Sequence, residues 1–190
     1  MGKSEVAKIL RSMEIPVFDS DQEVHNFYAS AEGRSFIERL IPDAVVTGKV
    51  DRQILGTRVL ANPKLLSELE TIVHAEIKNR RENFLKRERE NGRQLVVLDI
   101  PLLFETGSEK AVDFVLVVSA NPDVQYSRAL TRPGMIKEKF DAILARQLPD
   151  EEKRQHADYI IENNGSKVDL KNQVYSIVEM IRKTTGPAKQ

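Results

Sequence analysis

The sequence contains no cysteine, so it can form no disulfide framework, thiol nucleophile or cysteine-based metal site. It also lacks a net charge, because 29 basic residues balance 29 acidic ones. This balance gives no general reason to expect nucleic acid or a membrane surface as a partner, so anion binding must come from local clusters. No apolar run reaches the roughly 18 residues of a membrane span, and no signal-peptide pattern precedes the charged N-terminal segment. We therefore expect a cytoplasmic protein.

At 190 residues the chain can bury a sizeable core and fits one domain, with room for an inserted lobe. Its clearest predicted strand is Leu95–Asp99, a continuous apolar run of the kind found in parallel strands that are buried on both faces. Further strands are predicted over Phe114–Val118 and Tyr159–Ile161. A closing helix is predicted over Asp169–Lys183, followed by a frayed tail over Thr184–Gln190.

The first chemical signal is Gly2-Lys3-Ser4, which opens a segment of helical periodicity that runs to Met13. These residues match the last part of the phosphate-binding loop G-x-x-x-x-G-K-[ST]. In that loop, backbone N–H groups and a helix N-terminus hold phosphates, the lysine reaches the outer phosphates and the hydroxyl binds Mg²⁺. Three residues alone are also compatible with an N-terminal helix that carries an incidental lysine. The first half of the loop does not occur before Gly2, so we expect the chain to begin partway through the motif.

Carboxylates follow two of the predicted strands. A short apolar strand leads into Asp19 and Asp21, and Leu95–Leu98 lead into Asp99. Because ligands of parallel α/β sheets lie beyond the carboxyl ends of the strands, we expect these side chains at the same edge as the phosphate loop. Asp99 is suited to hold Mg²⁺ directly or through water. For Asp19 and Asp21 the alternative is that one of them caps the helix that follows.

Residues 22–90 are predicted to be almost entirely helical, with short breaks at prolines and a glycine. The longest helix, Lys64–Arg89, combines one apolar stripe that faces a core with a heavily charged opposite side. Such charge is typical of a solvated helix face. His74 lies beside Val73 of the stripe, and the pattern alone favours a structural histidine over a catalytic one.

Arg128, Arg132 and Arg146 lie around a break at Pro133-Gly134, between helices predicted over residues 123–131 and 138–148. Planar guanidinium groups bind phosphate oxygens bidentately, so this cluster suits a lid that covers phosphates. The alternative is a solvated surface.

Three longer motifs follow the half phosphate loop in the chain: Ile15-Pro16-Val17-Phe18-Asp19-Ser20-Asp21, Asp99-Ile100-Pro101-Leu102-Leu103-Phe104-Glu105-Thr106-Gly107 and Ile143-Leu144-Ala145-Arg146-Gln147-Leu148-Pro149. Taken together, they resemble the dephospho-CoA kinase family. The resemblance spans Gly2 to about Lys183 and includes smaller matches at Asp51-Arg52, Asn62-Pro63, Arg128–Gly134 and Ala157–Gly165.

This resemblance implies an α/β fold of the P-loop kinase type, a parallel sheet flanked by helices whose first strand is apparently missing. It divides the domain, residues 1–183, into a core (1–24, 91–126 and 155–183), a helical substrate lobe (25–90) and a lid (127–154). The implied reaction is ATP-dependent phosphorylation of the ribose 3′-hydroxyl of dephospho-CoA, the final step of coenzyme A synthesis.

The resemblance also assigns residues to ATP. Gly2, Lys3, Ser4 and Arg146 would bind its phosphates, and Ser4 and Asp99 would hold Mg²⁺. Lys3 would also take part in the transfer step.

Other residues are assigned by the same resemblance to the transfer and to the acceptor. Asp21 would be the general base that accepts the hydroxyl proton, and Arg128 and Arg132 would offset charge on the transferring phosphoryl group. The residues expected to face dephospho-CoA are Asp19, His74, Phe104 and Glu105.

The chain departs from the family pattern at Glu5, which replaces a usual threonine, and at Ala75, which replaces the proline after the family's histidine. With half of the loop missing, we also expect the 190-residue chain to bind and turn over ATP poorly. Two other hypotheses remain: a different P-loop small-molecule kinase, and a non-catalytic CoA-binding protein that has lost ATP binding.

Overall fold

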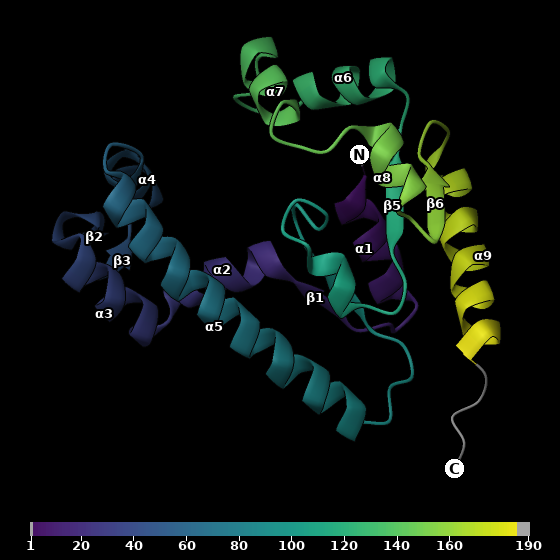
Figure 1. The fold of residues 1–190 in the computed structure, drawn as a ribbon, viewed down its shortest axis with the longest axis horizontal. Helices are drawn as coiled ribbons and strands as arrows, with labels where there is room; N and C mark the ends of the chain where they lie inside the picture. The colour runs from purple at the N-terminus through teal and green to yellow at the C-terminus, as the bar shows by residue number, and fades with distance from the viewer. Residues whose placement is uncertain (1, 186–190) are drawn as a thin grey trace. The chain divides into compact units, whose positions relative to one another are not determined.

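The computed structural model describes residues 2–185. The chain divides into two compact units, and we describe each by itself (Figure 1). The helical unit comprises residues 18–98, and the core unit comprises the described residues before Phe18 and from Asp99 onward. The predicted tail is wrong at Thr184, which still belongs to the last helix, whereas residues 186–190 lie outside the described part of the chain.

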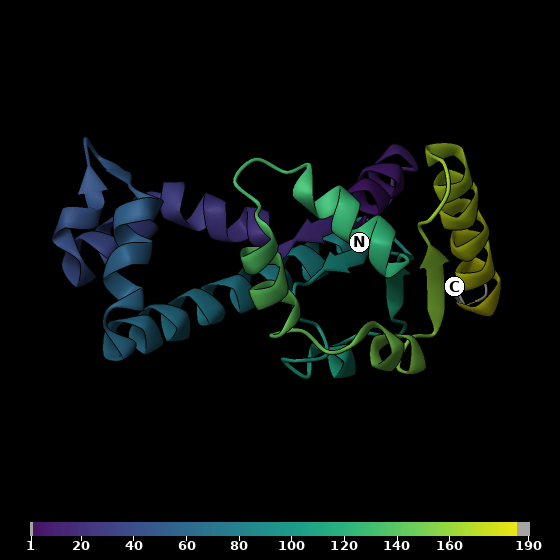
Figure 2. The ribbon, with the colours of Figure 1, turned by 90° about the horizontal axis from the view of Figure 1, so that it is seen from above.

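The core unit contains a parallel pair of strands, in which Leu116 lies opposite Tyr159 and Ser119 opposite Glu162. Helix α9 packs along β6, and α1 packs against α9 (Figures 1 and 2). The elements concerned are α1 (Lys3–Ser12), β5 (Leu116–Ser119), β6 (Tyr159–Glu162) and α9 (Lys167–Thr185).

These elements form because apolar side chains recur with the helical period in α1 and α9 and within short apolar runs in β5 and β6. Ile161 of β6 is 0% exposed, as expected for the middle of a strand that is covered by a helix. The other buried apolar residues of these four elements are Val6, Ala7, Leu10, Val117, Leu170, Val174, Ile177 and Val178. The result is a small α/β layer that supports the N-terminus of α1.

The rest of the core unit consists of short helices: η2 (Ser108–Ala111), α6 (Pro122–Leu130), α7 (Lys137–Leu144) and α8 (Asp150–Gln155). Helices α6 and α7 pack together, and the rings of Tyr126 and Phe140 lie 5.6 Å apart between their centroids. The helix predicted to reach Leu148 ends at Leu144 instead. Pro149 disfavours helical backbone at the residue before it, so the helix stops a turn earlier and leaves Arg146 outside it.

The helical unit is built around α5, a 28-residue helix. Its elements are β1 (Val17–Asp19), α2 (Ser20–Ala29), α3 (Ala31–Leu40), η1 (Pro42–Ala44), β2 (Val45–Val46), β3 (Lys49–Val50), α4 (Arg52–Leu60), α5 (Pro63–Glu90) and β4 (Val97–Asp99). Figures 1 and 2 both show α3, α4 and the β2–β3 hairpin gathered near the beginning of α5. Their buried side chains form one cluster: Phe27, Ile37, Ile41, Ala44, Leu55, Val59, Leu69 and Val73.

The structure differs from the predictions for this unit in two places: a hairpin surrounds the predicted break at Gly48, and β4 is less buried than expected. The break at Gly48 is the turn of an antiparallel hairpin, where Thr47 and Gly48 both have positive φ, as a two-residue type I′ turn requires. Strand β4 begins at Val97, and its Val97 and Leu98 are half-buried rather than buried on both faces. Its hydrogen-bonded neighbour among the described strands is β1, so it lacks the two flanking strands of a sheet interior.

No helix within residues 2–185 is both long enough and apolar enough to cross a membrane.

Candidate active site

The N-terminus of α1 is shaped by Gly2. This residue has φ 123°, and its carbonyl accepts hydrogen bonds from the N–H groups of Glu5 and Val6 at 2.9 and 3.0 Å. A Cβ at this position would lie 2.1 Å from Nδ2 of Asn163, so glycine is required for both the backbone angle and the close approach. The free N–H groups of the first helical turn make this terminus attractive for an anion.

Lys3 and Asp99 are the ionic pair next to this terminus. The ammonium of Lys3, whose side chain is 49% exposed, contacts Oδ1 of Asp99, whose side chain is 6% exposed. Besides this ion pair, Oδ1 of Asp99 accepts no hydrogen bond from the described residues. A buried carboxylate oxygen in this state can still accept a ligand or a cation.

A pocket of about 250 Å³ opens beside the same terminus. Arg128 is fixed at its wall, because it donates hydrogen bonds to the carbonyls of Asn163 at 2.6 Å and Gly165 at 3.5 Å. The residues that line the pocket are Gly2, Glu5, Arg128, Arg132, Asn163, Gly165, Lys167 and Leu170. The structure therefore brings two of the three predicted lid arginines together with the loop glycine.

Glu5 is the one acidic side chain in this lining. Its carboxylate is paired with Lys167 at 3.9 Å and with Lys8 at 3.5 Å, so two cations partly compensate its charge. The pocket keeps a positive balance, which suits a phosphate-bearing ligand.

Arg146, Phe104 and Glu105 are placed elsewhere in the core unit. Arg146 is exposed and does not line the pocket. The ring of Phe104 lies 5.9 Å from that of His156. Oε1 of Glu105 accepts a hydrogen bond from the N–H of Leu148 at 2.6 Å.

In the helical unit, Asp19 is the N-cap of α2 and accepts a hydrogen bond from the N–H of Gln22 at 3.1 Å. Asp21 is exposed in the first turn of the same helix, so its carboxylate is accessible to a reactant. The alternative that one aspartate is a cap is thus confirmed for Asp19. His74 is exposed on α5.

Sequence reasoning missed part of the pocket lining and one half-buried ionic network. Asn163, Gly165 and Lys167 follow β6, and their only sequence signal is the Asn-Asn-Gly turn. Arg80 was included in a solvated helix face, yet its side chain is only 28% exposed and pairs with Glu23. Periodicity cannot separate a paired arginine from a free one on the same helix.

A divalent cation fits the donors of the core unit. The buried Oδ1 of Asp99 and the exposed hydroxyl of Ser4 are hard oxygen donors of the kind that Mg²⁺ prefers. The described residues contain no group of three or more His, Cys, Asp or Glu that could hold a metal.

The class of protein that this α/β fold belongs to is that of the small-molecule kinases. The sequence model of the dephospho-CoA kinase family matches residues 1–169, and the chain belongs to this family. It is 45% identical over 181 residues to the dephospho-CoA kinase of Agrobacterium fabrum, covering 95% of this chain and 93% of that protein. With the enzyme of Mesorhizobium japonicum it shares 45% identity over 186 residues, which cover 98% and 94% of the two chains.

Solved structures share the fold of this chain. The crystal structure of TT1252 from Thermus thermophilus matches with a TM-score of 0.80 and 35% identity, covering 95% of this chain and 92% of that one. Dephospho-CoA kinase from Campylobacter jejuni matches with a TM-score of 0.72 at 24% identity, covering 97% and 94%, and so shares the fold. The predicted family, fold class and enzyme class are therefore confirmed.

Proposed function

We propose that the chain transfers the γ-phosphoryl group of ATP to the ribose 3′-hydroxyl of dephospho-CoA and so forms coenzyme A, with the residue roles given below. The observation that carries the proposal is the anion site at the N-terminus of α1, where Gly2, Arg128 and Arg132 converge in a chain of this family. Since ATP and the CoA precursor are cytoplasmic metabolites, we assign the reaction to the cytoplasm.

On the donor side, the N–H groups at the start of α1 bind phosphate oxygens, and Lys3 leaves Asp99 to contact the outer phosphates. Arg128 and Arg132 stabilise negative charge that develops on the transferring group. Ser4 and Asp99 would hold Mg²⁺, which supplies charge neutralisation of the phosphates when it is bound. Arg146 remains a predicted phosphate ligand from the lid.

On the acceptor side, Asp21 accepts the proton of the 3′-hydroxyl. It is exposed and is not the residue that caps α2, so its carboxylate is available for this role. Asp19 keeps the helix start in place through its bond to Gln22. His74, Phe104 and Glu105 remain predicted acceptor contacts.

The donor site can be tested by titrating the protein with ATP and Mg²⁺ by calorimetry. Lys3→Met removes the phosphate lysine, and we expect ATP affinity to fall roughly tenfold or more, as the loss of one charge-assisted hydrogen bond implies. Lys171→Met is the matched control, because Lys171 belongs to the core unit but lies over the Tyr175 ring instead of the pocket. Equal ATP affinity of Lys3→Met and the unsubstituted chain would refute the assignment of the donor site.

A further inference from the structure

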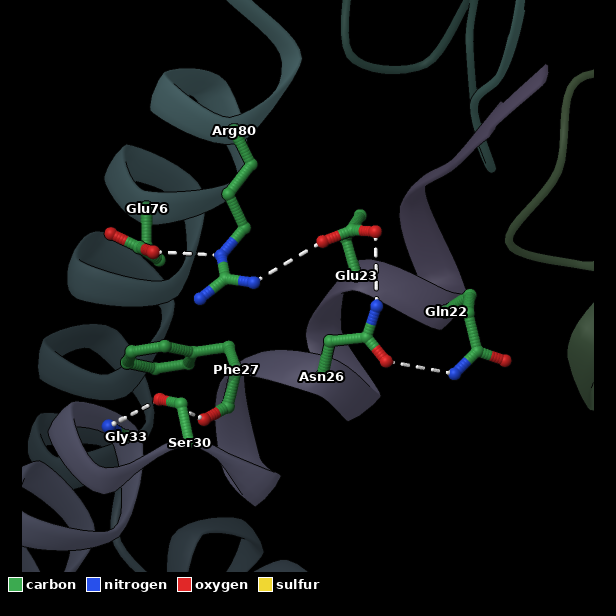
Figure 3. Close-up of polar contacts among 8 residues, drawn as sticks. All are labelled: Gln22, Glu23, Asn26, Phe27, Ser30, Gly33, Glu76 and Arg80. Carbon is green, nitrogen blue, oxygen red and sulfur yellow. Dashed lines mark hydrogen bonds and ion pairs between the residues drawn. The ribbon is translucent and has the colours of Figure 1, made fainter. Parts of the chain in front are cut away.

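The side chain of Arg80 joins two helices of the helical unit. Its Nε donates to Oε1 of Glu76 at 2.7 Å within α5, and its Nη1 donates to Oε2 of Glu23 on α2 at 3.2 Å. Its guanidinium carbon also lies 5.9 Å from the centroid of the Phe27 ring, one turn further along α2. Figure 3 shows the guanidinium between these three side chains.

This bridge is shielded from solvent. The exposed fractions are 28% for Arg80, 25% for Glu23 and 33% for Glu76, so the pairs are screened less than exposed ones. Burial alone would lower the pKa of Arg80, but the hydrogen bonds that it donates to Glu76 and Glu23 raise this pKa above its usual value. The planar fork of arginine presents separate nitrogens to the two carboxylates in a fixed geometry, which the single ammonium nitrogen of a lysine does not reproduce.

The bridge continues along the first turns of α2. Oε1 of Glu23 accepts a hydrogen bond from Nδ2 of Asn26 at 3.0 Å, and Oδ1 of Asn26 accepts one from Nε2 of Gln22 at 3.1 Å (Figure 3). Gln22 and Glu23 directly follow Asp21 in the chain. The residues on the C-terminal side of Asp21 are therefore tied to Arg80, while the backbone of Gln22 is tied to the Asp19 cap.

We propose that Arg80 is a positioning residue for phosphoryl transfer: through Glu23 and Phe27 it holds the first turn of α2 on α5 and so fixes the direction of the Asp21 carboxylate. The inference rests on the proposed role of Asp21. A reactant group that is displaced by about 1 Å can lose on the order of 10²-fold in rate, so a shift of this helix turn affects kcat before it affects substrate affinity.

Two pairs of variants separate the bridge from general effects of charge. Glu23→Gln removes the negative charge from the pair that connects the two helices, whereas Glu76→Gln removes it from the pair within α5. Arg80→Met removes the whole bridge, and Lys78→Met is its matched control, since Lys78 pairs only locally with Glu82 along α5. Arg80→Lys keeps the charge and one of the two bonds.

The first readout is amide hydrogen exchange of residues 24–28, which requires no turnover. We expect Arg80→Met and Glu23→Gln to exchange roughly fivefold faster in this stretch than the unsubstituted chain, because local opening of α2 becomes easier. Lys78→Met should leave exchange unchanged, and Arg80→Lys should lie between. Exchange in Arg80→Met equal to that of the unsubstituted chain would overturn the inference, whatever the enzyme assays show.

The second readout is kcat and KM for dephospho-CoA. Arg80→Met should lower kcat roughly tenfold or more with little change in KM, and should add nothing further in an Asp21→Asn background, because it acts through Asp21. Losses that multiply in the double variant, or an unchanged kcat, would overturn the inference while leaving the proposed function intact. Absence of CoA formation by the unsubstituted chain would count against the proposed function instead.

Discussion

Asp19 and Asp21 lie two residues apart, and substitutions at the two positions should separate helix stability from catalysis. The perturbations are Asp19→Ala, Asp19→Asn and Asp21→Asn. Asp19 accepts the hydrogen bond from Gln22 that caps α2, whereas Asp21 is an exposed side chain within the first turn.

The stability effects follow from these positions. Asp19→Ala removes the cap and should lower the free energy of unfolding by about 0.5–2 kcal/mol, while Asp19→Asn keeps a side chain that can cap and should cost less. Asp21→Asn removes only a favourable charge near the helix N-terminus, an effect of about 0.3–1 kcal/mol at exposed positions.

For activity we expect the larger loss from substitution of Asp21, and not from substitution of Asp19. Asp21→Asn removes the group that accepts the hydroxyl proton, so kcat should fall by about 10²–10⁴-fold while dephospho-CoA binding is retained. Asp19→Asn keeps the cap and should retain most activity if Asp19 serves only the helix.

The assay combines urea unfolding with steady-state kinetics on the same preparations. An Asp21→Asn variant with unchanged kcat would refute the role of Asp21 as the base. An Asp19→Ala variant as stable as the unsubstituted chain would refute the assignment of the cap.

Three further predictions concern the core unit. Arg128→Ala should lower both kcat and thermal stability, because it leaves the carbonyl of Asn163 without its guanidinium donor. Arg132→Ala should lower kcat alone. Equal melting temperatures of the two variants would contradict this prediction. Glu5→Thr removes the acidic group of the pocket and should tighten ATP binding roughly two- to fivefold in a low-salt titration, with unchanged affinity as the contrary result. The pKa of Asp169 is lowered by hydrogen bonds from Ser166, so its stabilising effect is present above its usual pKa and is lost as pH falls. Asp169→Asn should therefore flatten the acid limb of the stability profile, and an unchanged limb would refute this stabilising role of Asp169.

Periodicity and terminal residues predicted most of the helices, because apolar spacing and capping are local properties of the chain. The helix predicted to open with Gly2-Lys3-Ser4 is an example, since α1 begins at Lys3 with Gly2 as its N-cap. The hairpin at Thr47 and Gly48 was missed, because its two-residue strands are too short to show alternation.

The candidate site was only partly predictable from the sequence. Gly2, Lys3 and Asp99 belong to motifs with a known chemistry, so their placement could be anticipated. Asn163 and Lys167 reach the pocket through the packing of α9 and β6, and long-range packing leaves no local signature. Arg80 carries the same charge as its exposed neighbours, and only its distance to Glu23 across the helices distinguishes it.

The central claim is that the chain phosphorylates dephospho-CoA with ATP bound at the start of α1. The most direct test is to identify the product. Dephospho-CoA, ATP and Mg²⁺ would be incubated with the 190-residue chain and, in parallel, with its Lys3→Met variant. Mass spectrometry and phosphorus NMR would then locate the added phosphate. We predict a phosphate on the ribose 3′-oxygen, formed more slowly by Lys3→Met, because this variant lacks the ammonium that contacts the outer phosphates. Absence of 3′-phosphorylation by the 190-residue chain, or equal rates with and without the Lys3 ammonium, would contradict the account.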